Sequence, residues 1–176
     1  RTLGRLFMRT SWMTHDWMTW WHEAALFDAL IGNTDRHQDN WGILIQRLKK
    51  RTLVTLAPLF DNGTSLGHEL FTQNVAAWTS DRYDFYMNRG THHMRWEKTD
   101  AKKCKHLDLL QRMQADAGGH LPGLRQKLEN FDLSSFAGQL QDLCQMVMPI
   151  PLTPDRKKLY IDLVTLRRER ILKVLK

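Results

Sequence analysis

The sequence lacks the features of disulfide-rich, membrane-spanning and secreted proteins. Its 176 residues include only two cysteines, Cys104 and Cys144, which lie far apart and match no metal-ligand spacing. A reduced cytoplasmic setting is therefore the simpler expectation. No apolar run approaches the roughly 20 residues of a membrane-spanning helix, and the first residues contain no signal-peptide core. From these absences we expect no membrane partner. Because the chain begins with Arg rather than Met, we also expect it to be a piece of a longer protein.

The composition argues against disorder and only weakly for nucleic-acid binding. Hydrophobic residues make up 42% and charged residues 26% of the chain, which is typical of one globular domain. The formal net charge of +7 is of the kind that attracts nucleic acids or acidic membranes. Nearly all of this excess lies in residues 101–176, whereas residues 1–100 are almost neutral. Any activity of the first part must therefore be argued without the charge.

Periodicity and turn chemistry predict a mainly helical chain with a small β-hairpin. Apolar residues at helical spacing predict a buried helix over about 15–31, ended by Gly32. Runs of β-branched and apolar residues at 41–48 and 52–60 predict the hairpin. Four tryptophans crowd the first 21 residues: Trp12, Trp17, Trp20 and Trp21. We interpret them as core residues, and a docking surface is the alternative.

The second half of the chain is predicted to be mostly helical. Residues 64–98 are polar and aromatic and are interpreted as irregular. Helices are predicted over 99–117 with Thr99 as the cap, near 121–131 and 134–148, and from Thr153-Pro154 to the end. The run Arg167-Arg168-Glu169-Arg170 is interpreted as a solvated helix face, with docking to DNA or an acidic partner as the alternative.

The most informative pattern is GNTDRHQDN followed by LAPLFDNG. Asp35 and Asn40 lie five residues apart in a polar loop, and Asp61 follows the second strand of the predicted hairpin. Because a hairpin returns the chain to its starting edge, we expect Asp61 close to that loop. Converging carboxylate and amide oxygens suit Mg²⁺ with bound phosphate. A simple helix-capping loop is the alternative.

The same layout forms the second half of a protein-kinase active site. In such sites a loop Asp accepts the proton of the substrate hydroxyl, and an Asn five residues later holds a metal ion. A second Asp, placed after a hairpin, holds the metal ions that bridge the phosphates of ATP. By this layout Asp35 is the catalytic base, and Asn40 and Asp61 are the metal and cofactor ligands.

The two segments GNTDRHQDNWGIL and LAPLFDNGTSLG resemble the C-terminal lobe of HipA-like serine/threonine kinases, the toxins of bacterial toxin–antitoxin pairs. They are more distantly similar to the motifs of phosphoinositide-3/4-kinase-related enzymes. The match covers about 40 residues, from Phe27 to Gly67. It implies the same roles for Asp35, Asn40 and Asp61, and it implies that the catalytic-site residue His37 orients the loop.

The resemblance implies the C-terminal, helical lobe of a protein-kinase-like fold. Residues 1–176 would form a single domain, with the catalytic loop and metal-binding segment at 27–67 and a helical bundle at 99–176. The chain has no GxGxxG, and Lys49 and Lys50 lie at the hairpin tip, where they cannot serve as the phosphate-binding Lys. We expect the N-lobe to come from another segment or chain, and this chain to be inactive without it.

The implied function is ATP- and Mg²⁺-dependent phosphorylation of a protein hydroxyl. The resemblance further implies a translation-related protein substrate and a DNA-binding antitoxin as partner. Two alternatives remain: a phosphoinositide-kinase-like lipid kinase lobe, and a nucleic-acid or protein interaction module that uses the basic last helix. The segment RGTHHMRW (89–96) also resembles HipA-like sequences, and we expect a structural or substrate-facing role for His92-His93 rather than a zinc site.

Overall fold

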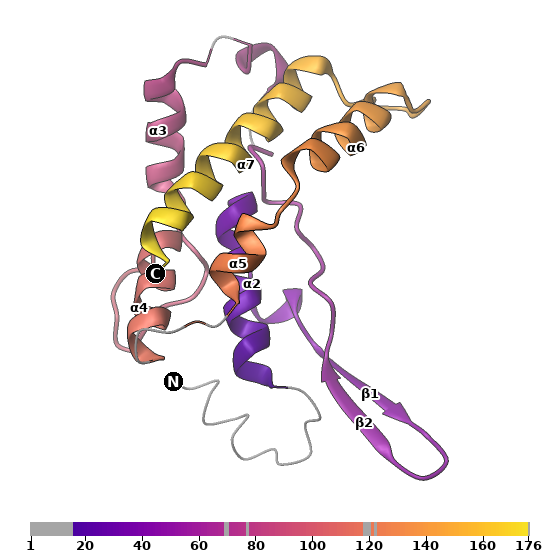
Figure 1. The fold of residues 1–176 in the computed structure, drawn as a ribbon, viewed down its shortest axis with the longest axis vertical. Helices are drawn as coiled ribbons and strands as arrows, with labels where there is room; N and C mark the ends of the chain where they lie inside the picture. Colours follow the sequence, from indigo (N-terminus) through magenta and orange to yellow (C-terminus); the bar gives the residue numbers. More distant parts are fainter. Residues whose placement is uncertain (1–15, 69–70, 77, 118–120, 122, 176) are drawn as a thin grey trace.

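The computed structural model describes residues 16–68, 71–76, 78–117, 121 and 123–175 (Figure 1). These residues form a helical body from which one hairpin projects, which confirms the predicted fold class. The elements are α2 (Trp17–Ile31), the 3₁₀ helix η1 (Gln38–Asn40), β1 (Ile43–Arg47), β2 (Thr52–Leu56), η2 (Thr72–Asn74), α3 (Ser80–Arg89), α4 (His106–Asp116), α5 (Leu124–Glu129), α6 (Leu133–Gln145) and α7 (Pro154–Val174). None of the helices in the described ranges is long and apolar enough to cross a membrane.

Helix α2 confirms the first predicted helix and most of its expected packing. It begins at the Asp16 cap and ends at Gly32, whose φ of 70° is the left-handed geometry that glycine adopts without strain. Trp21 is buried, and Trp17 and Trp20 pack partly buried around it. The expected core role therefore holds for these three tryptophans, whereas Trp12 lies outside the described residues.

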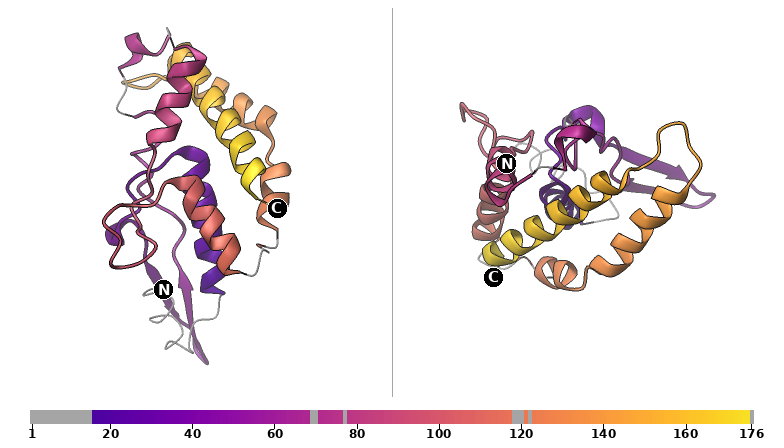
Figure 2. Two further views of the ribbon diagram at one scale, coloured as in Figure 1. Left: turned by 90° about the vertical axis from the view of Figure 1, so that its left-hand side faces the viewer. Right: turned by 90° about the horizontal axis from the view of Figure 1, so that it is seen from above.

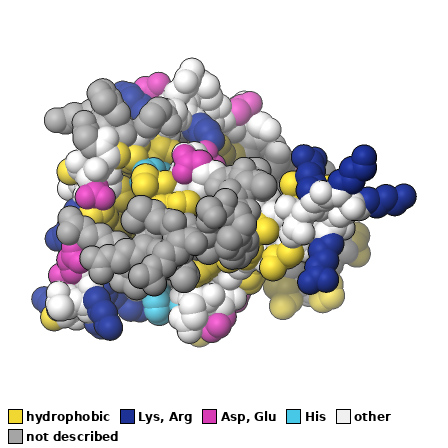
Figure 3. Space-filling model, turned by 90° about the horizontal axis from the view of Figure 1, so that it is seen from below, with side chains coloured by type: hydrophobic (Ala, Val, Ile, Leu, Met, Phe, Trp, Pro, Cys, Tyr) yellow, Lys and Arg dark blue, Asp and Glu magenta, His cyan; other side chains and the backbone are white. Residues whose placement is uncertain are grey.

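The hairpin forms as predicted, but one of its strands is unusually open. Strands β1 and β2 pair antiparallel, with Ile43 opposite Leu56. Every residue of β1 is exposed, and Leu44 and Ile45 keep 51% and 61% of their surface accessible. Seen from below, Lys and Arg side chains cluster on this projection beside exposed hydrophobic ones (Figure 3). The hairpin thus presents apolar surface to solvent next to a basic tip.

Helix α7 is the long element around which the body is organised. Its start follows the predicted chemistry, since the hydroxyl of Thr153 caps the backbone of Arg156 and a proline occupies the first turn. Leu159, Leu163 and Ile171 are fully buried along it. It packs against α2, α4, α5 and α6, and it runs across the body in the view of Figure 1 and in the two views of Figure 2. The helix predicted from Thr153-Pro154 onward is thus confirmed.

Two predictions about the middle of the chain are wrong. Helix α4 begins at His106 rather than at Thr99, because residues 96–99 and 101–102 form turns and bends and Lys105, in a β-bridge with Thr91, has an extended backbone. Helix α3 lies inside the segment that was interpreted as irregular. Its apolar content is low, and only Tyr83 and Met87, one turn apart, reach the core.

The interpretation of the C-terminal arginine run as a solvated face is also wrong. Arg167 is 6% exposed and donates to the carbonyl of Ala29 at the end of α2 (3.3 Å). Arg168 donates to two carbonyls at the end of α5, both at 2.8 Å. Arg170 pairs with Asp84 of α3. Cations at helix C-termini offset the exposed carbonyls and the helix dipole, so these arginines hold helices together.

Candidate active site

The candidate catalytic loop follows α2 directly and is fixed by Asn33. The side chain of this buried residue donates to Asp28 on α2 (3.0 Å). Its Oδ1 atom accepts the backbone N–H of Asp35 (3.1 Å) and the hydroxyl of Thr64 (2.8 Å). One amide side chain therefore joins the last turn of α2, the candidate base and the segment after the hairpin.

A buried ion pair between Asp28 and Arg36 lies beneath this loop. Arg36 donates to both carboxylate oxygens of Asp28, through Nη2 at 2.7 Å and Nε at 3.0 Å, and both side chains are fully buried. Burial alone would raise the pKa of Asp28, but hydrogen bonds from His92 and Arg36 lower it below its usual value. The carboxylate therefore stays ionised and pairs bidentately with the guanidinium.

Arg36 also joins the two halves of the candidate site. Its Nη1 atom donates to the carbonyl of Asn40 (2.8 Å) and to that of Phe60 (2.7 Å). Its Nη2 atom reaches Oδ1 of Asn62 at 2.5 Å. All five guanidinium N–H groups are used, counting the two that bind Asp28. The carbonyl oxygens of Asn40 and Phe60 both bind Nη1, so their separation is at most the sum of these two hydrogen-bond lengths. The hairpin therefore brings its far end back to the loop, as the sequence predicted.

The predicted metal ligands are Asn40, whose carbonyl Arg36 binds, and Asp61, whose two neighbours Arg36 binds. Asn40 is 3% exposed, and its Nδ2 donates to the carbonyl of Asp35 (2.7 Å), which leaves the amide oxygen as the coordinating atom. Asp61 lies between the two residues that Arg36 binds and is exposed, with a φ of 50°. A non-glycine residue in this region is strained, and such strain is often concentrated at functional sites.

The two predicted ligands, Asn40 and Asp61, suit Mg²⁺ better than a metal ion whose ligands all come from the protein. Within the described ranges no group of three His, Cys, Asp or Glu side chains is arranged to hold a metal ion. One carboxylate and one amide oxygen, from Asp61 and Asn40, are instead the sparse set through which Mg²⁺ binds when phosphates and water supply the remaining oxygens. These two residues could thus hold Mg²⁺ only together with a phosphate-bearing ligand.

The candidate base Asp35 is partly exposed and lies between two histidines. Its carboxylate is 3.6 Å from Nε2 of His37 and 3.6 Å from Nδ1 of His93. The Nδ1 atom of His37 accepts the backbone N–H of Asp39 (3.2 Å) and so caps η1. This bond fixes the loop backbone at Asp39, and the orienting role implied for His37 stays a prediction. The exposed edge of Asp35 is available to a substrate hydroxyl.

Residues 91–94 bring a further part of the chain to the site. His92 is 1% exposed; its Nε2 lies 3.0 Å from Asp28, and its Nδ1 accepts the N–H of Met94 (3.1 Å). The ring is therefore the Nε2–H tautomer that donates to the carboxylate. His93 follows it and faces Asp35, and burial followed by the charge of Lys103 lowers the pKa of His93. The only sequence signal was the His92-His93 pair, whose contact with Asp35 spans more than fifty residues.

Comparisons with known proteins support the fold. No protein-family model matches the sequence, and no curated protein matches it. Among solved structures, the chain is similar to the Helicobacter pylori proinflammatory kinase CtkA, with a TM-score of 0.67 and 22% identity. The likeness covers 90% of this chain and 52% of that one, so this chain spans about half the length of the kinase. At this identity the comparison shows a kinase-like fold.

Proposed function

We propose that the chain is the C-terminal lobe of a HipA-like serine/threonine kinase that transfers the γ-phosphate of ATP to a protein hydroxyl. The observation that carries this proposal is the set of bonds from Arg36 to the backbones of Asn40 and Phe60. These bonds hold the loop of the candidate base against the segment of the second acid, within a kinase-like fold. The proposed chemistry needs both parts at one phosphate group.

In the proposed reaction Asp35 accepts the proton of the acceptor hydroxyl. The hydroxyl oxygen forms a bond to the γ-phosphorus as the bond from that phosphorus to the bridging oxygen breaks, and ADP leaves. Asp35 is suited to this role because its carboxylate is partly exposed, while its backbone is fixed by Asn33 and Asn40. Positioning and charge stabilisation supply most of the acceleration in phosphoryl transfer.

Asn40 and Asp61 would hold Mg²⁺, which neutralises negative charge on the phosphate oxygens when it is bound. Arg36 acts on these ligands indirectly, since it fixes the backbone of Asn40 and both neighbours of Asp61. We regard it as a positioning residue, because every one of its donors is directed to the protein itself.

The remaining partners are proposed with less direct support. The Gly-rich loop and strand Lys would come from an N-lobe in cis or in trans, and the exposed apolar strand β1 is surface that such a lobe could cover. A translation-related protein substrate and a DNA-binding antitoxin rest on the resemblance to HipA-like kinases alone. The basic last helix gives little support to nucleic-acid binding, since its arginines bind neighbouring helices.

The experiment measures phosphate transfer from ATP by the complete protein. We expect Asp35→Asn and Asp61→Asn each to reduce transfer by roughly 10²–10⁴-fold, with unchanged circular dichroism. Asp39→Asn is the matched control, because Asp39 lies in the same loop with its side chain 76% exposed. Retained activity in both site variants refutes the assignment. Turnover with phosphoinositide vesicles but not with protein would identify a lipid kinase instead.

A further inference from the structure

A cavity of about 410 Å³ is lined in part by Thr34, the residue before the candidate base Asp35. It is open to solvent on one side and is lined by residues just after α2, on α3 and on α7. Its size is within the range of small-ligand pockets. Among the described residues, the charged side chains that line it are Arg82, Arg89 and Arg167, and none of the lining side chains is acidic. Three guanidinium groups around one cavity predict an anionic ligand.

Two of these arginines are held in place without losing their charge. The guanidinium of Arg82 lies 5.7 Å from the ring centre of Trp78, and that of Arg89 lies 5.3 Å from the ring centre of Phe85. Neither forms an ion pair with a carboxylate in the described part of the chain. Aromatic faces orient a cation but leave its N–H groups available, so both donors are arranged for a ligand.

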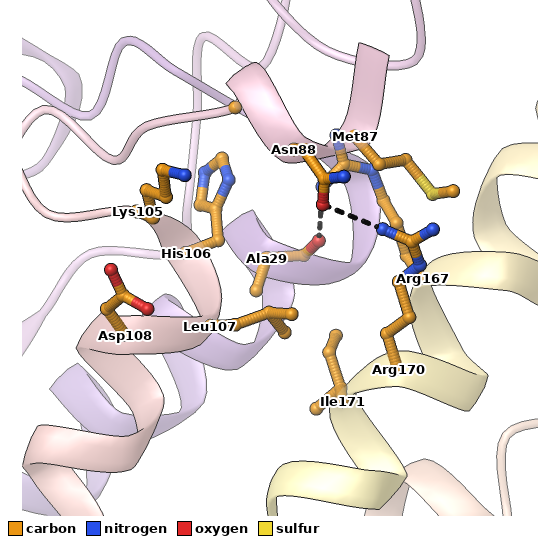
Figure 4. Close-up of a pocket in the computed structure, with 11 residues that line it drawn as sticks. Ala29, Met87, Asn88, Lys105, His106, Leu107, Asp108, Arg167, Arg170 and Ile171 are labelled. Atoms are coloured by element: carbon orange, nitrogen blue, oxygen red, sulfur yellow. Dashed lines mark hydrogen bonds between the residues drawn. The ribbon is translucent and has the colours of Figure 1, made fainter. Parts of the chain in front are cut away.

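The third arginine forms the rigid wall of the cavity. A Cβ atom at Gly32 would lie 2.6 Å from Nη2 of Arg167, and one at Gly90 would lie 3.4 Å from the same atom. Figure 4 shows the other side of this wall, a smaller cavity of about 180 Å³ where Arg167 lies near His106 and Arg170. Burial, and then the charge of Arg167, lower the pKa of His106 to about 4. His106 is therefore neutral near pH 7, and Arg170 is paired with an acid of α3.

Two of the residues that line the cavity are close in the chain to residues of the candidate site. Thr34, which lines it, immediately precedes Asp35 in the chain. Gly90, which also lines it, begins the short segment that leads to His93, 3.6 Å from the same carboxylate. An anion bound here would therefore contact residues that are one to three positions along the chain from Asp35 and His93.

We propose that this cavity binds a phosphate monoester on the acceptor peptide, a residue already phosphorylated a few positions from the hydroxyl that is modified. The inference rests on the proposed kinase function and specifies its substrate class. A phosphate dianion offers three oxygens to planar guanidinium groups, whereas a carboxylate offers two oxygens and half the charge. A cavity of this volume has room for one phosphorylated side chain.

The test measures binding to the 176-residue chain without ATP or Mg²⁺. The probes are nonapeptides with a central serine and, at each flanking position in turn, phosphoserine, glutamate or alanine. We expect phosphoserine at one or two positions to tighten binding by at least roughly 10-fold over alanine, and Arg82→Gln with Arg89→Gln to weaken that binding by roughly 100-fold. Both side chains are exposed, so the fold should survive. Arg47→Gln with Arg51→Gln, on the hairpin, is the matched control.

The outcomes separate this assignment from its alternatives. Equal affinity for all peptides, or equal loss in the control, overturns it. Inorganic phosphate that binds as tightly as the phosphopeptides shows that the peptide is not the carrier and overturns it. Preferred binding of a single-stranded oligonucleotide also overturns it. Because neither ATP nor catalysis is involved, failure here leaves the kinase proposal intact, whereas absence of transfer by the complete protein refutes that proposal without affecting the binding result.

Discussion

Replacing Arg36 with Met should show how far the candidate site depends on one buried guanidinium. Methionine keeps the unbranched apolar stem of the side chain but removes the guanidinium, with its charge and all five donors. Asp28 would then be left as a fully buried carboxylate with only Asn33 and His92 as partners. The carbonyls of Asn40 and Phe60 would both lose the donor that holds them together.

The expected magnitude follows from the loss of one partner of a buried ion pair. Such a loss costs about 3–5 kcal/mol, because the remaining charge stays buried without compensation. The protein has 176 residues, and a domain of this kind is stable by only about 5–15 kcal/mol. We therefore expect Arg36→Met to lower the free energy of unfolding by about 3–5 kcal/mol and to shift the urea midpoint strongly. Arg47→Met, at an exposed hairpin position, is the control.

A double-mutant cycle separates the ion pair from other effects of the substitution. With Asp28→Asn added, the uncompensated charge disappears, so the double variant should be more stable than the sum of the two single losses by at least about 1 kcal/mol. Urea denaturation followed by circular dichroism measures all four proteins. A loss below about 1 kcal/mol for Arg36→Met, or strict additivity in the cycle, would refute the reasoning.

Three further predictions concern the helices. Gly32→Ala should destabilise the protein by more than about 1 kcal/mol, because φ is 70° and a Cβ would meet the guanidinium of Arg167. Gly138→Ala, with open space around it in α6, should instead stabilise the protein by up to about 1 kcal/mol. Thermal melts that rank the two variants the other way would contradict this. Arg168→Gln should cost about 1–3 kcal/mol, since two α5 carbonyls lose their donors, and a variant with an unchanged urea midpoint would show that these bonds contribute nothing. His106 has a pKa of about 4 when folded and about 6.5 when unfolded. Between these values the unfolded chain binds the extra proton, so stability is full above pH 6.5 and falls by up to about 3 kcal/mol as the pH drops toward 4. Denaturation at a series of pH values should show this slope flattened in His106→Gln, and an equal slope in both proteins would contradict the assignment.

Local chemistry predicted the elements whose signals lie within a few residues. The caps of α2 and α7 and the hairpin strands follow from short patterns, and the hairpin brings the far segment back to the loop of Asp35. Helix α3 was missed because just two of its side chains enter the core, so its pattern is mostly polar. The start of α4 was misplaced because a bridge to the distant Thr91 keeps Lys105 out of the helix.

The parts of the site that the sequence could not predict depend on partners that have no side-chain signature. Arg36 binds two backbone carbonyls, and so does Arg168, and a carbonyl is present at every position of any sequence. The contact of His93 with Asp35 requires the fold to bring together segments that no local pattern relates. From the sequence alone, the basic run of the last helix was therefore interpreted as exposed to solvent, because the backbone carbonyls that its arginines bind have no sequence signal.

The open hairpin has a consequence for the behaviour of the chain at high concentration. In a two-stranded sheet each strand keeps one edge of unpaired N–H and C=O groups, and such edges are templates for pairing with another copy. Strand β1 adds exposed Ile43, Leu44 and Ile45 to its edge. The charges of Lys49, Lys50 and Arg51 at the tip oppose this pairing through repulsion, and salt screens that repulsion beyond about 10 Å at 0.1 M. We therefore expect the isolated chain to stay dispersed in dilute buffer and to aggregate as salt is added, through the same strand whose surface a second lobe would cover.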